Sequence, residues 1–93
     1  MLPKYADIEL PLLQELARRD GQARPGDRDA SGNSVYEALA DHFGLTPSDR
    51  AEVILERGTA RLKWENMVRY AVRHLRSTGN IEKNSAHGVW VLA

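Results

Sequence analysis

Polar side chains suited to binding nucleic acid recur at helical spacing between residues 64 and 78, in the segment WENMVRYAVRHLRST. On a helix of 3.6 residues per turn, one face is apolar and consists of Trp64, Met67, Val68, Ala71, Val72 and Leu75. The opposite face consists of Asn66, Arg69, Tyr70, Arg73 and Arg76. Guanidinium groups pair with phosphates and guanine edges, and a carboxamide pairs with an adenine edge. We therefore interpret residues 64–78 as an amphipathic recognition helix, which Gly79 ends.

The segments before this helix must position it, and their patterns predict three more helices. The expected helices and their N-caps are 8–19 with Asp7, 34–43 with Asn33 or Ser34, and 47–55 with Thr46. The third of them would bury Ala51, Ile54 and Leu55. Residues 20–32 are rich in glycine and charge and predict a flexible loop, in which Gln22–Arg24 is at most a short strand.

Two short β-capable runs follow the basic helix. Residues 80–83 and 89–92 flank a polar turn that ends in glycine, which predicts a hairpin. Residues 57–63 lack helical periodicity and are expected as a loop or a short extended piece. The order of helices followed by a hairpin predicts one α+β domain over residues 1–93. Its fold class is a winged helix-turn-helix, mainly helical, with a C-terminal β-hairpin wing.

Composition excludes several protein classes. The chain has 93 residues and no cysteine, so it has no disulfide framework and no thiolate zinc site. No apolar run approaches the ~20 residues that span a bilayer. Acidic residues near the N-terminus occupy the place of a signal peptide's apolar stretch. We therefore expect a cytoplasmic protein without a membrane partner.

The formal net charge is zero, but the charge is unevenly distributed. Residues 57–83 contain 7 Lys or Arg against 2 Asp or Glu, whereas residues 1–45 contain 5 against 8. A neutral chain with one basic face still steers a polyanion toward that face.

Three segments together resemble a known family: EALADHFGLTPSDRAE, KWENMVRYAVRHLRSTGNIE and GVWVL. They are similar to the N-terminal domain of Mrr-type restriction system proteins, over roughly Leu10 to Leu92. The family's motif residues fall on Lys63, Trp64, Asn66, Tyr70, Gly88, Val89 and Trp90. The chain departs from the family at Met67, where arginine is frequent, and in a longer 20–32 loop.

The resemblance implies a winged helix that binds DNA and precedes a nuclease domain, often in systems that restrict methylated or otherwise modified DNA. The residues themselves predict no catalysis, because the chain has no recognisable catalytic motif and its carboxylates are dispersed. The three histidines lack ligand spacing, so no metal and no cofactor are expected.

We therefore predict a non-catalytic module that binds double-stranded DNA and recognises the target, including a methylated or modified one, for a restriction endonuclease. The alternatives are a winged helix that dimerises or docks another protein, and a transcriptional regulator that uses the same surface. The expected partners are double-stranded DNA and a fused or associated nuclease domain, and a homodimer is left open. The expected DNA-binding residues are Arg61, Lys63, Asn66, Arg69, Tyr70, Arg73, Arg76, Lys83, Asn84, Ser85 and His87.

Overall fold

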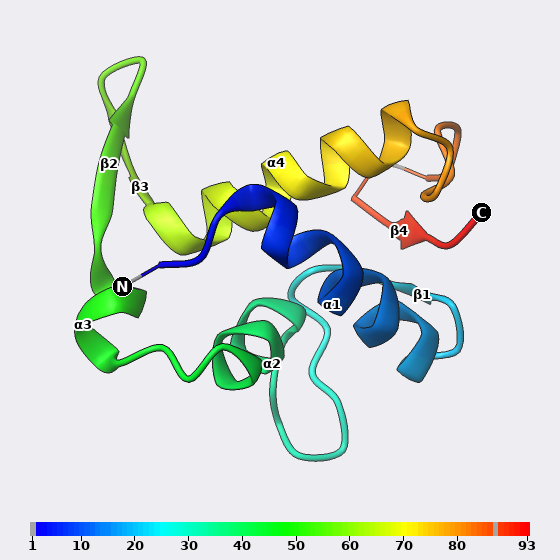
Figure 1. Cartoon of the computed structure of the whole chain (residues 1–93), viewed down its shortest axis with the longest axis horizontal. Helices are drawn as coiled ribbons and strands as arrows, with labels where there is room; N and C mark the ends of the chain where they lie inside the picture. The colour runs from blue at the N-terminus through cyan, green and yellow to red at the C-terminus, as the bar shows by residue number, and fades with distance from the viewer. Residues whose placement is uncertain (1, 87) are drawn as a thin grey trace.

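Four helices and two small antiparallel sheets make up the fold, in a computed structural model that describes residues 2–86 and 88–93. The α+β class is therefore confirmed. Figure 1 shows α4 lying across α1, with α2 beneath them. The elements in chain order are α1 (Tyr5–Arg18), β1 (Gln22–Ala23), α2 (Val35–His42), α3 (Pro47–Ala51), β2 (Val53–Glu56), β3 (Thr59–Leu62), α4 (Lys63–Ser77) and β4 (Trp90–Val91).

The core lies between α1, α2 and α4. The apolar stripe of α1 is buried at Ile8, Leu12 and Leu16, as its spacing predicts. These side chains belong to one cluster with Val68 of α4 and Leu39 of α2. Full burial of one such aliphatic side chain contributes about 1.5–3 kcal/mol, so this cluster dominates the stability of the domain.

The first helix begins three residues earlier than predicted. Its N-cap is Lys4, and Asp7 is the third helical residue. The Asp7 carboxylate accepts a hydrogen bond from the backbone N–H of Lys4 at 3.3 Å. Asp7 thus satisfies a helix-terminal N–H from inside the first turn and is not itself the cap. The caps of the next two helices are confirmed, because Ser34 accepts from the Glu37 N–H and Thr46 from the Asp49 N–H.

The predicted third helix is wrong beyond Ala51. Residues 53–62, which we call the arm, form a β-hairpin that projects from the helices (Figure 1). Arg57 and Gly58 form its two-residue turn with φ values of 51° and 78°, the signs required by a type I′ turn. Leu55, expected to be buried, is 78% exposed. Its β-branched neighbours favour a strand, and the tight turn at Arg57 and Gly58 lets that strand pair with the next residues.

The C-terminal hairpin is confirmed only in part. Residues 81 and 92 form a single antiparallel bridge, whereas β4 pairs with β1. The weakly predicted strand at Gln22–Ala23 therefore exists. Trp90 and Ile81 are both buried. The segment around β4 therefore lies between β1 and Ile81, against the helical core.

The loop predicted to be flexible is extensively hydrogen-bonded. The Arg19 guanidinium donates to the backbone oxygens of Asp27 and Asn33, at 2.8 and 2.9 Å. The Asp29 carboxylate accepts from the Ser31 hydroxyl and the Asn33 N–H, and it pairs with Arg18 at 2.7 Å. The Ser31 hydroxyl, the Asn33 N–H and the Arg18 guanidinium together hold the pKa of Asp29 well below its usual range.

This network predicts an acid-sensitive contribution to stability. The pKa of Asp29 is lower in the folded chain than the ~3.9 of an unfolded aspartate. The unfolded state therefore binds more protons below about pH 4, and the stabilisation present above that pH is lost as the pH falls. We expect Asp29→Asn to flatten the dependence of the thermal midpoint on pH between about 2 and 5. Asp20→Asn is the control, and an equal flattening in that variant would contradict the assignment.

Candidate nucleic-acid interface

Helix α4 places one face in the core and the other in solvent, as predicted. It begins at Lys63 after the N-cap Leu62 and ends at Ser77. Trp64, Val68 and Val72 are buried. The Trp64 indole N–H donates to the backbone oxygen of Tyr36 at 2.9 Å, which ties the start of α4 to α2. Burial of this face determines which α4 side chains remain available to a ligand.

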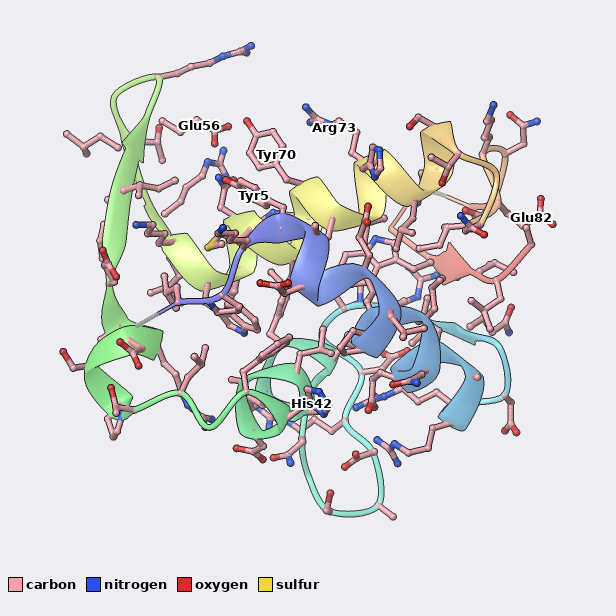
Figure 2. The ribbon with its side chains drawn as sticks, viewed as in Figure 1. Tyr5, His42, Glu56, Tyr70, Arg73 and Glu82 are labelled. Carbon is pink, nitrogen blue, oxygen red and sulfur yellow. The ribbon has the colours of Figure 1, made fainter. Side chains whose placement is uncertain are left out.

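The exposed face of α4 presents Arg69, Tyr70 and Arg73. Tyr70 is 41% exposed, and its ring lies edge-on to Tyr5 with 5.9 Å between centroids. The Arg73 guanidinium lies over the Tyr70 ring, 5.0 Å from its centroid. This cation–π contact orders the Arg73 side chain without neutralising it. Figure 2 shows Tyr5, Tyr70 and Arg73 close together along one side of the molecule.

Arg69 makes only long contacts with its neighbours. One guanidinium nitrogen lies 3.4 Å from the Tyr36 hydroxyl and 3.9 Å from the Glu65 carboxylate. Burial raises the pKa of Tyr36, although the adjacent Arg69 charge opposes that shift. Tyr36 therefore keeps its proton at neutral pH, and Arg69 retains a positive charge that only a distant carboxylate offsets.

Asn66 is not on the solvent face where it was predicted. Only 8% of it is exposed, and no hydrogen-bond partner for its carboxamide is present in the described part of the chain. The arm meets the start of α4 through β3, so its residues lie near Asn66. Between them is a cavity of about 170 Å³, lined by Glu56, Arg61, Asn66, Arg69, Tyr70 and Arg73.

Two predicted contacts are engaged within the domain. Arg76 is half-buried, and its guanidinium donates to the backbone oxygen of Val89 at 3.4 Å, so it holds the C-terminal segment. Its Nε is buried without a partner among the described residues. Lys63 lies 3.3 Å from the Glu52 carboxylate. Arg61 is exposed on β3 and lines the cavity.

The predicted C-terminal contacts lie beyond the far end of α4. Lys83 and Asn84 are exposed. The Ser85 hydroxyl donates to the Val89 oxygen at 2.8 Å and so stabilises the local turn. His87 lies outside the described residues.

Sequence reasoning missed the contribution of the arm. Glu56 and Tyr70 point toward one another in Figure 2, from the arm and from α4. Arg57 is exposed at the turn of the arm. The available signal was the Arg-Gly pair between two β-capable runs, VILE and TARL, which is a weaker hairpin marker than Asn-Gly.

A family model for the Mrr N-terminal domain matches residues 5–93. The chain belongs to this family. The Mrr N-terminal domain is a module of restriction-system proteins, separate from the nuclease domain. No curated protein and no solved structure matches the chain.

Basic side chains of this Mrr N-terminal domain fall into two groups. In its first half, Arg18, Arg19 and Arg28 pair with carboxylates, whereas Arg24 has no ion pair in the described residues. Arg57, Arg61 and Arg73 have no ion-pair partner within residues 2–86 and 88–93. The unneutralised charge is therefore concentrated on the arm and α4.

In the described ranges, no group of three or more His, Cys, Asp or Glu side chains is placed to hold a metal ion. No helix in the same ranges is long and apolar enough to cross a bilayer.

The unpartnered carboxamide of Asn66 predicts a stabilising substitution. The Asn66 side chain is largely withdrawn from bulk water without a hydrogen-bond partner in the described residues, although its amide atoms still reach the cavity. Leucine has the same number of side-chain non-hydrogen atoms, and its burial adds apolar contacts where the amide gains no hydrogen bond. We expect Asn66→Leu to raise the free energy of unfolding by about 1 kcal/mol in urea denaturation. The control is Asn33→Leu, which removes a 3.0 Å hydrogen bond to Asp41 and should be destabilising. Destabilisation by both variants would show that Asn66 makes a favourable interaction.

Proposed function

We propose that this Mrr N-terminal domain is a non-catalytic winged helix that binds double-stranded DNA through α4. The observation that carries the proposal is that Arg57 and Arg61 of the arm and Arg73 of α4 have no ion-pair partner in the described residues, and that Arg73 lies over the exposed ring of Tyr70. Unneutralised cations near a polyanion release its counterions on binding, which is the main electrostatic source of affinity for DNA.

The arrangement of elements supports the winged-helix assignment. Helices α1, α2 and α4 pack around one core, and α4 is the last of them. Strand β4 pairs with β1 and meets Ile81 from the other side, which provides the small sheet that follows the recognition helix. In this interpretation α3 and the arm are inserted between the second and third helices of the bundle.

The two parts of the surface have different roles in the proposed complex. Helix α4 enters the major groove, where Arg69 and Arg73 contact base edges, each bidentate contact providing about 1–3 kcal/mol of discrimination. Tyr70 contacts the methyl group of thymine or of 5-methylcytosine. Arg57 and Arg61 of the arm contact backbone phosphates, which orient the domain without reading sequence.

This role fits a target-recognition module of a restriction endonuclease. Members of the family occur in restriction-system proteins, where this domain is separate from the nuclease domain. Cleavage would then belong to a fused or associated nuclease. Sensitivity to base modification would arise at Tyr70, so a duplex bound equally well with and without 5-methylcytosine would exclude that part of the proposal.

Removal of two α4 arginines tests the DNA-binding proposal. We expect Arg69→Ala with Arg73→Ala to weaken duplex binding at least about tenfold at low salt, because two charged contacts are lost. The measurement is fluorescence anisotropy with a labelled random-sequence duplex at two salt concentrations. The charge-matched control is Arg28→Ala with Arg50→Ala, whose guanidiniums pair with Glu37 and Asp41 elsewhere. The proposal fails if the two double variants bind alike.

A second pair of variants locates the phosphate contacts. Each phosphate contact contributes about 0.9 to the slope of log affinity against log salt. We therefore expect Arg57→Ala with Arg61→Ala to reduce that slope by about 1.8. Lys83→Ala, at the predicted C-terminal wing, should reduce it by at most about 0.9. An unchanged slope in the arm variant would remove the arm from the interface.

The outward face of the arm favours protein association as a second candidate function. Val53, Leu55 and Leu62 lie on this face and are all exposed. Exposed apolar side chains in a group are typical of protein contacts. Concentration-dependent association that Leu55→Lys abolishes would support this function, and it is compatible with DNA binding on the opposite face.

A further inference from the structure

We propose that the cavity between the arm and α4 receives a single nucleobase that has left the base stack. Asn66 and Glu56 would bind the hydrogen-bonding edge of this base. The inference rests on the proposed DNA binding and adds a ligand class and a mode of recognition to it. No catalytic step is involved.

The cavity has a size suited to one base. Its volume of about 170 Å³ is several times the ~30 Å³ that one water occupies in the liquid. Its walls come from two elements. The arm contributes Glu56 and Arg61, and α4 contributes Asn66, Arg69, Tyr70 and Arg73. Tyr70, which contacts Tyr5 and lies beneath the Arg73 guanidinium, forms one wall of the cavity.

Asn66 is the observation that points to a ligand. Its carboxamide has two donors and a carbonyl acceptor, and within the described residues none of them has a partner. The residue is more than nine-tenths buried and lines the cavity. A stacked base presents only its edge in the groove, whereas a base rotated out of the duplex can enter the cavity and meet the Asn66 carboxamide.

Glu56 distinguishes a base from a phosphate. Three guanidiniums around one cavity would by themselves suit a phosphate group. The Glu56 carboxylate lies on the same cavity, however, and has no ion-pair partner in the part of the chain that the structure describes. A phosphate would be repelled by Glu56 and would leave the Asn66 carbonyl without a donor. A base edge offers both donors and acceptors, and guanine offers two adjacent N–H donors to a carboxylate together with a carbonyl acceptor.

The experiment compares three labelled duplexes of one sequence. The first is fully matched, the second has a single bulged guanine, and the third has a bulged abasic nucleotide at the same position. The abasic bulge bends the duplex in the same way but offers no base. We expect the protein to bind the bulged-guanine duplex about tenfold more tightly than the abasic one, because only the guanine offers a base edge that can form hydrogen bonds with Asn66 and Glu56.

Two variants assign this preference to the cavity. Asn66→Leu should reduce it to less than about twofold while affinity for the matched duplex is retained. Glu56→Gln should reduce the preference in the same way. Because Glu56 lies on the arm, this variant tests the cavity even if circular dichroism shows that Asn66→Leu alters the fold. The control is Glu82→Gln, a change at the far end of α4 (Figure 2), which should leave the preference unchanged.

The remaining outcomes separate the base pocket from DNA binding as a whole. Equal binding of the guanine and abasic bulges by the wild-type protein would overturn the base pocket and leave the DNA-binding proposal intact. A uniform loss of affinity for all three duplexes in Asn66→Leu would make Asn66 a contact to stacked DNA and would also overturn the pocket. A wild-type protein that binds none of the duplexes would overturn both proposals.

Discussion

Burial of the apolar face of α4 against α1 and α2 is the constraint on which the rest of the molecule depends. Val68 and Val72 are almost completely inaccessible and meet Ile8 and Leu12 in one core. Rotation of α4 about its axis would expose these side chains at a cost of several kcal/mol. The same burial therefore holds Arg69, Tyr70 and Arg73 on the outside. The Trp64 hydrogen bond to α2 prevents sliding along the axis at one end, and Arg76 contacts the C-terminal segment at the other.

The positions of unneutralised positive charge in this domain depend on which arginines form ion pairs more than on the net charge of each segment. The first half of the chain is net acidic, and three of its arginines, Arg18, Arg19 and Arg28, are bound to Glu15, Asp29 and Glu37 around the loop before α2. The arm and α4 have few carboxylates within reach, so their guanidiniums keep their full charge. A molecule with no net charge can therefore present one cationic side. This separation matters for recognition, because a paired arginine would have to break its ion pair before it met a phosphate.

Asn66 illustrates how a binding surface can oppose stability. The Asn66 carboxamide has no hydrogen-bond partner in the described residues of the free domain, so an apolar side chain at this position would contribute more to stability. The arm contributes to this arrangement because it lies beside the start of α4. It also adds Glu56 and Arg61 to a cavity that the helix alone would not have. The cavity therefore forms only where the arm and α4 lie side by side, and neither element would form it alone.

The sequence alone determined the elements whose signals are local. The apolar periodicity of α1 and α4, the capping residues Ser34 and Thr46, and the family motifs were all readable, because each depends on neighbours within a few residues. Only the tertiary structure decided the rest. Residues 53–56 are a strand because they pair with residues 59–62, and β4 is a strand because it pairs with β1, far away in the chain. Asn66 is 8% exposed and lines a cavity with residues of the arm, although its helical position alone predicted exposure. Strand pairing and packing between elements involve residues that a local pattern does not connect, so the cavity at α4 became visible only in the folded chain.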